Sequence, residues 1–286
     1  MSLTVVASQA APLAIDAPRE LFEQACSAML TKTPDGGMLV FPEMHLFADG
    51  QPDRARTKAY QQAAEPLDGP RVTWLRQLAA GLGVWLVPGT VCERGPSGEL
   101  FNTALAIRPD GEVAATYRKI FPWRPLEPFT PGQDFAVFDV PGAGRMGLCI
   151  CFDSWFPEVS RNLAWLGAET IINVVKTTTP DRPQEMVMAR ANAIVNQVNF
   201  LSVNAAAPVG RGLSAFFGPE GETLAEIGDD APADMVCEVS TQRVRRARAE
   251  GTAGVTRPWA FFHSGDQPVE LPAYGGRIDP TRWNRD

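Results

Sequence analysis

The sequence has few histidines, few lysines and no long hydrophobic stretch. Its 286 residues include two histidines, His45 and His263, which are too few for a histidine-rich metal centre. No apolar run approaches the roughly 20 residues that a membrane-spanning helix needs, so we expect no membrane partner. The N-terminal residues carry no basic segment and alternate like a strand, which is not typical of a signal peptide.

Charge and cysteine content narrow the class of protein further. The net charge is −7 and the isoelectric point is near 5.0, and this acidic balance disfavours a nucleic-acid partner. The one basic cluster, Arg243–Arg248, is typical of a solvated helix face. The five cysteines are an odd number at irregular spacing. Without a signal peptide they indicate a reducing compartment, so we expect a cytoplasmic protein.

Hydrophobic periodicity predicts alternating strands and helices. Predicted strands cover residues 3–8, 38–41, 84–91, 103–108, 113–118, 146–151, 170–175, 200–204, 213–217 and 223–225. Predicted helices cover residues 18–32, 72–82, 157–166 and 184–197. This order is typical of an α/β fold with sheets inside and helices outside. We expect one domain over residues 1–263, followed by an extended tail, residues 264–286, that is rich in Pro, Gly, Arg and Asp.

The segment MGLCICFDSWFPE, residues 146–158, places two cysteines where a predicted strand ends. Cys149 and Cys151 lie two residues apart on one face of that strand, so a disulfide between them would be strained, and a metal site lacks further ligands. Two interpretations stay open: buried core residues, or a nucleophile at a strand-to-helix turn. The helix N-terminus that follows would favour a thiolate.

A nucleophilic cysteine needs a base. His45 is the only plausible histidine, because His263 lies in the aromatic stretch WAFFH, which is typical of packing. Other candidates also follow predicted strands. Glu43 comes after the apolar strand MLVF and Pro42, and Lys119, one of only four lysines, comes after VAATYR. Each alone is typical of a structural residue, but a carboxylate, an amine and a thiol at three strand ends suggest a catalytic set.

These three segments resemble those of the nitrilase superfamily of carbon–nitrogen hydrolases. LVFPE is similar to the glutamate segment, GEVAATYRKIFPWRPLEPFTPG to the lysine segment and GLCICFDSWFPE to the cysteine segment. The likeness extends over about residues 3–250 in the family's order. It implies a four-layer α-β-β-α sandwich that forms homodimers or larger homo-oligomers, with no cofactor and no metal.

The resemblance also implies roles for particular residues. Cys151, not Cys149, is the implied nucleophile, Glu43 the general base, and Lys119 the cation that stabilises the oxyanion together with the backbone N–H of Phe152. Glu127, in PLEPF, matches a second glutamate that holds the lysine or positions substrate, although a surface loop carboxylate is the alternative interpretation. We expect Asp153 to fix the turn by accepting backbone N–H groups.

Departures from the family pattern bear on the substrate. Phe152-Asp153 follows the cysteine, as in amide-cleaving branches, and Trp155 stands where carboxylate-binding members carry arginine. These residues indicate a small, neutral amide as substrate, with Phe152, Trp155, Trp123 and Thr177 as pocket residues, unless the aromatic rings belong to the core. The alternatives are an N-carbamoyl amine hydrolase, a soluble acyltransferase and a catalytically inactive binding protein of the same fold.

Overall fold

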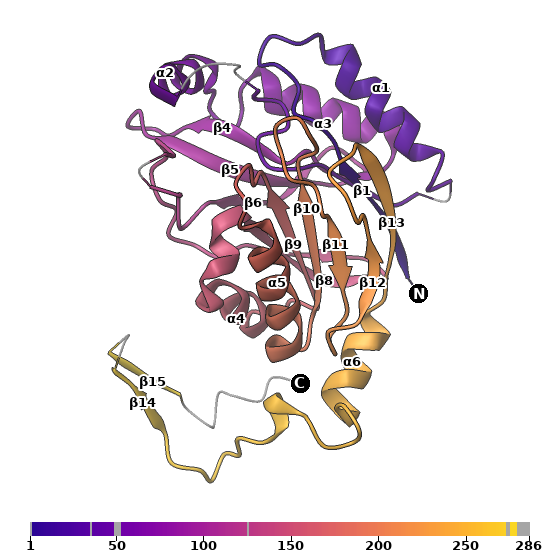
Figure 1. Cartoon of the computed structure of the whole chain (residues 1–286), viewed down its shortest axis with the longest axis vertical. Helices are drawn as coiled ribbons and strands as arrows, with labels where there is room; N and C mark the ends of the chain where they lie inside the picture. Colours follow the sequence, from indigo (N-terminus) through magenta and orange to yellow (C-terminus); the bar gives the residue numbers. More distant parts are fainter. Residues whose placement is uncertain (1, 35, 49–52, 125, 273–274, 279–286) are drawn as a thin grey trace.

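The computed structural model describes residues 2–34, 36–48, 53–124, 126–272 and 275–278. Two sheets pack face to face, and helices cover their outer faces (Figure 1). This is the α-β-β-α sandwich that the sequence predicts. Across the described part of the chain, no helix combines the length and apolar character that crossing a membrane requires.

The first sheet is seven-stranded in the described chain and has the order β13-β1-β2-β3-β5-β4, with β6 paired to β5. Its strands are β1 (Leu3–Gln9), β2 (Met38–Val40), β3 (Trp85–Val87), β4 (Thr90–Arg94), β5 (Leu100–Ile107), β6 (Val113–Arg118) and β13 (Ala233–Val239). Strands β1, β2 and β3 run parallel, whereas β13 pairs with β1 in the antiparallel sense.

The second sheet is six-stranded in the same residues, in the order β12-β11-β10-β9-β8-β7. Its strands are β7 (Val137–Val140), β8 (Gly144–Ile150), β9 (Thr170–Val175), β10 (Asn199–Asn204), β11 (Ala215–Phe217) and β12 (Thr223–Glu226). Strands β8, β9 and β10 are parallel. Most of their side chains are buried, and apolar residues dominate the later part of β8 and most of β9.

The helices divide between the two outer faces. Helices α1 (Arg19–Leu30) and α3 (Pro70–Leu82) pack on the first sheet, and α4 (Pro157–Trp165) and α5 (Arg182–Asn196) pack on the second. The other helical segments are α2 (Asp53–Ala63), α6 (Thr241–Glu250) and the 3₁₀-helices η1 (Cys151–Trp155) and η2 (Pro258–Ala260).

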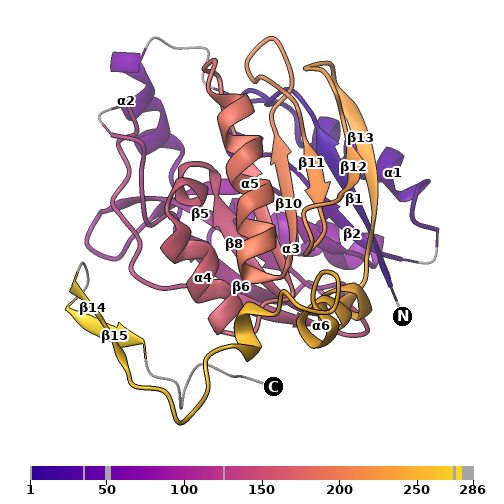
Figure 2. The same ribbon diagram turned by 60° about the horizontal axis from the view of Figure 1, so that its bottom comes forward.

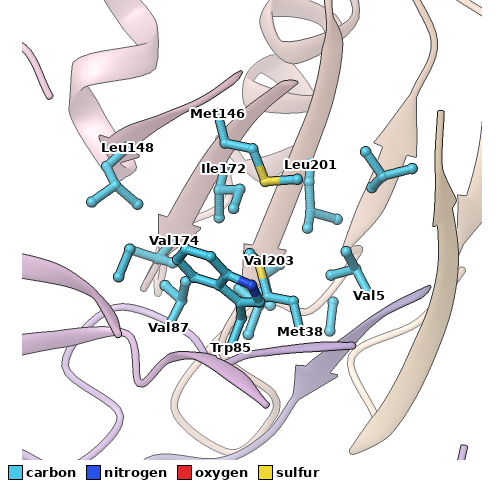
Figure 3. Packing of buried hydrophobic residues seen from close by; sticks show 14 of the residues in the cluster. Val5, Met38, Trp85, Val87, Met146, Leu148, Ile172, Val174, Leu201 and Val203 are labelled. Atoms are coloured by element: carbon cyan, nitrogen blue, oxygen red, sulfur yellow. The ribbon is translucent and has the colours of Figure 1, made fainter. Parts of the chain in front are cut away.

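The main hydrophobic core lies between the two sheets (Figure 3). Strand pleating sends alternate residues of β2 to opposite sides: Met38 and Val40 face the second sheet, and Leu39 packs under α1 and α3. Burying each such side chain stabilises the fold by roughly 1.5–3 kcal/mol. The labelled members of the core cluster are Val5, Met38, Trp85, Val87, Met146, Leu148, Ile172, Val174, Leu201 and Val203.

Several predicted elements change in the structure. The predicted strand 84–91 is two strands, β3 and β4, because Gly89 adopts a left-handed conformation with φ 83° between them. The predicted strand 146–151 ends at Ile150, since Cys151 already begins η1. Helix α2 and strands β7 and β13 were not predicted from the sequence. In β13 the inward residues Met235, Cys237 and Val239 alternate with exposed residues, and this period of two in the sequence is typical of a half-buried strand.

The described residues of the predicted tail include two short strands. Strands β14 (Val269–Leu271) and β15 (Gly276–Ile278) pair as a two-stranded antiparallel sheet. Figures 1 and 2 show this pair extending away from the sandwich, beyond α4. Most described side chains from 263 to 272 are exposed. This segment therefore buries little surface against its own chain.

Candidate active site

Lys119 lies at the centre of a buried charge cluster. It directly follows β6, and its side chain is only 1% exposed. Its ammonium donates to Glu43 Oε1 at 2.9 Å and to Glu127 Oε1 at 2.8 Å. Burial opposes the charge, but the carboxylates of Glu43 and Glu127 outweigh it and raise the pKa of Lys119 well above its ordinary value. The amine therefore stays cationic and uses two of its three N–H donors.

Glu43 keeps one carboxylate oxygen available. It follows β2 and the Phe41-Pro42 pair, and it is 2% exposed. Its Oε1 accepts from Lys119 and from Asn102 Nδ2, the latter at 2.7 Å. No described residue hydrogen-bonds to Oε2, so this oxygen can accept a proton. Asn102 was not among the predicted site residues, because a cross-strand partner on β5 cannot be recognised without the sheet register.

Glu127 is partly exposed, and one of its carboxylate oxygens turns inward to Lys119. Its role in catalysis stays a prediction. Its second oxygen, Oε2, accepts from the backbone N–H of Trp123 at 2.9 Å. The same carboxylate therefore fixes both the lysine and the turn that carries Trp123.

Cys151 opens η1 in a left-handed backbone conformation, with φ 47°. This conformation is unfavourable for a residue with a side chain and is typical of functional positions. Cys151 is partly exposed, whereas Cys149 is buried in the cluster beneath α4. None of the five cysteines forms a disulfide.

The thiolate expected from the sequence at Cys151 is not what the site favours. Burial raises the pKa of the Cys151 thiol well above its ordinary value, the Glu43 carboxylate raises it further, and the Lys119 ammonium only partly opposes both. The thiol therefore keeps its proton in the free enzyme. Attack by the sulfur then requires a base at the moment of reaction.

Asp153 holds the cysteine turn against the lysine segment. It accepts from Tyr117 Oη at 2.8 Å and from the backbone N–H groups of Phe121 and Ile150 at 2.8 and 3.3 Å. The predicted role of Asp153 in fixing the turn through backbone N–H groups is thereby confirmed. Burial raises its pKa to about 6, against the lowering effect of Lys119 and these hydrogen bonds.

Thr177 contacts the cysteine from the second sheet. It lies just after β9, and its Oγ1 is 4.0 Å from Cys151 Sγ. The hydroxyl lies 2.8 and 2.6 Å from the two carboxylate oxygens of Glu185. Glu185 pairs with Arg182 at 3.0 Å, and both side chains are buried. Glu185 and Arg182 were not predicted, because helical spacing on α5 gave no sign that they face the site.

The aromatic candidates border the cysteine turn. Phe152 lies 5.9 Å from Trp155 and meets Phe156 edge-on at 5.4 Å between ring centroids. The Trp155 indole N–H is buried without a hydrogen-bond partner among the described residues. Phe121 stacks on Phe156 at 3.6 Å, linking the lysine segment to this turn. Whether these rings and Trp123 line a substrate pocket stays a prediction.

His45 is not placed to act as the base. Its ring packs against Phe41 and Phe22, with centroids 4.9 and 5.8 Å apart. Burial lowers its pKa to about 3. In the described residues, no group of three or more His, Cys, Asp or Glu side chains is arranged to hold a metal ion.

Comparison with known proteins identifies relatives of this fold and site. Residues 5–249 match the family model described as carbon-nitrogen hydrolase. The chain is 31% identical over 259 residues to a formamidase of Pseudomonas syringae pv. tomato, covering 88% of this chain and 73% of that one. It is 42% identical over 119 residues to a formamidase of Bacillus thuringiensis, covering 41% of this chain and 36% of that one.

Solved structures agree with the fold. Nit3 of Saccharomyces cerevisiae, a member of the nitrilase superfamily, superposes with a TM-score of 0.77 at 23% identity, covering 86% of this chain and 93% of that one. An amidase from Nesterenkonia sp. superposes with a TM-score of 0.71 at 25% identity, covering 87% of this chain and 94% of that one. The chain therefore belongs to the carbon–nitrogen hydrolase family. Within the nitrilase superfamily it is a hydrolase of the amidase type.

Proposed function

We propose that this protein hydrolyses a small, neutral amide to a carboxylic acid and ammonia through a cysteine thioester. The observation that carries the proposal is the buried Lys119 ammonium between Glu43 and Glu127, in electrostatic contact with the Cys151 thiol. The formamidase relatives support a small amide. In a glutamate-to-glutamine mutant of the Nesterenkonia amidase, the acetamide moiety of fluoroacetamide adds covalently at the active-site cysteine, which supports the proposed attacking group.

In the acylation step, Glu43 Oε2 takes the Cys151 proton as the sulfur attacks the carbonyl carbon. The remaining N–H donor of Lys119 and the backbone N–H of Phe152 stabilise the oxyanion. Glu43 then gives the proton to the nitrogen, the C–N bond breaks and ammonia leaves. The raised pKa of Cys151 supports this order, because the thiol loses its proton only when the base removes it.

In the second step, water replaces ammonia. Glu43 removes a proton from the water, which attacks the thioester carbon. The C–S bond breaks, the proton returns to the sulfur, and the carboxylic acid leaves. Lys119 stabilises the second oxyanion as it did the first, and Glu127 keeps the ammonium in position.

The pocket residues and the setting belong to the same proposal. Phe152, Trp155 and Trp123 would form an apolar wall, and no arginine occupies the position of Trp155 to bind a substrate carboxylate. The five cysteines, none of which forms a disulfide, support a cytoplasmic setting. An N-carbamoyl amine is the second candidate substrate, supported by the similarity of CFDSWFPE to that branch.

The test is ammonia release from a panel of small amides, N-carbamoyl amines and nitriles. We expect turnover of simple amides that disappears in Cys151→Ala. Cys149→Ala is the matched control, since it removes a buried thiol two residues away and should keep the activity. Turnover of N-carbamoyl amines alone would favour the second candidate. No turnover of any compound by the native enzyme, or equal turnover by Cys151→Ala, would contradict the proposal.

A further inference from the structure

Next to the cysteine lies a buried polar group that the mechanism above does not use. It consists of Thr177, Glu185 and Arg182, all at most 5% exposed. Taking a guanidinium and a carboxylate out of water costs free energy that their attraction rarely returns in full. Charged pairs of this kind that adjoin a reactive group are candidates for functional roles.

The direction of the Thr177 hydroxyl is fixed by its partners. A threonine hydroxyl has one hydrogen to donate and two lone pairs to accept with. Both Glu185 oxygens lie within 2.8 Å of Oγ1, and a carboxylate only accepts, so the hydrogen points to Glu185. Arg182 compensates the charge of Glu185 at 3.0 Å. Thr177 can therefore offer only a lone pair toward Cys151 Sγ, 4.0 Å away.

The rest of the group is held rigidly. The backbone N–H of Thr177 donates to Asn204 Oδ1 at 2.9 Å. Arg182 also donates to the carbonyl oxygens of Gly212 and Leu213, each at 3.1 Å. These bonds join the end of β9, the end of β10 and the start of α5, so the acceptor beside the sulfur cannot easily turn away.

We infer that Thr177 accepts a hydrogen bond from the amino group of the substrate and that Glu185 and Arg182 are positioning residues that keep its lone pair directed there. This inference rests on the proposed amide hydrolysis. The sulfur and the amino group are substituents on one carbon after attack, so a group beside the sulfur can reach the nitrogen. When Thr177 accepts one N–H of the substrate amino group, the lone pair of that nitrogen points toward the proton held by Glu43. The site thereby favours leaving groups that carry N–H over those that do not.

The test compares an amide with the methyl and p-nitrophenyl esters of the same acid, whose leaving groups carry no N–H. We expect Thr177→Val to lower kcat/KM for the amide about tenfold more than for the esters. Thr177→Ala should do the same without added bulk. Thr177→Ser keeps the hydroxyl and should return amide kcat/KM to within about threefold of the native value. Glu185→Gln, whose amide N–H can occupy the lone pair, should also lose amide turnover selectively.

Thr103→Val is the matched control. Thr103 Oγ1 donates to buried Glu93 at 2.6 Å, and Glu93 pairs with Arg118, so the same pattern occurs away from Cys151. This variant should leave the amide-to-ester ratio unchanged. The inference would be overturned if Thr177→Val and Thr177→Ala lost kcat/KM equally on the amide and the esters, or if Thr177→Ser did not recover amide turnover. In either case, amide turnover by the native enzyme would still uphold the proposed function. Absence of native amide turnover would instead refute the proposed function itself.

Discussion

At the scale of single residues, the site combines one buried carboxylate, one partly exposed carboxylate, one ammonium and one thiol. Lys119 bridges Glu43 and Glu127, so one positive charge serves two negative ones. Burial, together with the Glu43 carboxylate, raises the pKa of Cys151 and keeps the proton on its sulfur. The arrangement suits a nucleophile that is activated only when the base acts, and it leaves Glu43 Oε2 for that task.

This protonated cysteine predicts a particular pH dependence of alkylation. Because burial and Glu43 raise the pKa of Cys151 well above 9.0, the thiolate fraction should rise about tenfold per pH unit between pH 7 and 9. The rate of iodoacetamide labelling, followed by mass spectrometry, should rise in proportion. Cys151→Ser should show little labelling, since the other cysteines are buried. A rate that is independent of pH near neutrality would contradict the prediction.

Asp153 predicts a pH dependence of stability. Folding raises its pKa from 3.8 to about 6, so the folded state binds this proton more tightly than the unfolded state. Below about pH 4, Asp153 is protonated in both states and does not lower the free energy of unfolding. Above about pH 6 it is ionised in both states, and burial of the charge lowers the free energy of unfolding by its full amount. From pH 4 to 6, the native protein should lose on the order of 3 kcal/mol of unfolding free energy relative to Asp153→Asn.

The measurement is urea unfolding of both proteins across this pH range. Asparagine can accept from the Phe121 N–H and donate to Tyr117, but it loses the longer bond from the Ile150 N–H. This loss does not depend on pH, so the pH trend still isolates the ionisation of Asp153. A difference in unfolding free energy that does not change with pH would show that Asp153 titrates equally in both states.

At the scale of elements, catalytic candidates lie where strands end and the chain turns sharply. Glu43 follows β2, Lys119 follows β6, Cys151 follows β8 and Thr177 follows β9. Strand residues alternate between two buried faces and are committed to packing. The first residues beyond a strand escape this alternation, so polar groups there can point toward one another.

The turn that carries Glu43 packs closely against Gly89, which leaves no room for a side chain there. A Cβ at Gly89 would lie 1.8 Å from the carbonyl oxygen of Pro42, directly before Glu43. Gly89→Ala should therefore destabilise the fold by more than about 2 kcal/mol and lower kcat by displacing Glu43. Thermal unfolding and amide turnover measure both effects.

Gly83→Ala is the matched control for this change. Gly83 also has a left-handed backbone, with φ 66°, but a Cβ added there would meet no atom of the described residues within 4 Å. This variant should cost only the conformational strain of about 1–2 kcal/mol and keep its activity. If the two substitutions changed the unfolding free energy and kcat equally, the close approach of Gly89 to Pro42 would not be the cause of either effect.

At the scale of the whole molecule, two surfaces suggest further association. The arm that carries β14 and β15 extends away from the sandwich (Figure 2). Between α5 and the β11–β12 edge of the second sheet, a groove of about 610 Å³ is lined in part by exposed Val187, which is 69% accessible. An exposed arm and an apolar helix face lower their free energy by packing against another chain.

We therefore predict a homo-oligomer whose contacts include the arm. Light scattering should give the mass of a dimer or larger assembly, and deletion of residues 264–286 should reduce it. The deletion should lower the melting temperature of the sandwich only through the lost contacts between subunits. The described arm residues are mostly exposed, so they add little packing within their own chain. A monomeric native protein, or an oligomer that survives the deletion, would contradict this role of the arm.

The sequence by itself determined the layers and the family of this molecule. Strands buried on both faces, such as β9, appear as mainly apolar runs, and helical spacing marks α1, α3, α4 and α5. Three motif segments in a fixed order identified Glu43, Lys119 and Cys151 as candidates. These signals are local, so each can be read from a few consecutive residues.

Only the tertiary structure decided how the candidates act on one another. Asn102 reaches Glu43 across 59 positions, and Tyr117 reaches Asp153 across 36. No local pattern records such contacts, nor does it record the burial that keeps the Cys151 thiol protonated. The same holds for Glu185 and Arg182, whose helix gives no sequence sign of the cysteine it faces. Hydrogen-bond direction and desolvation depend on the packed environment, which exists only once the two sheets and α5 have come together.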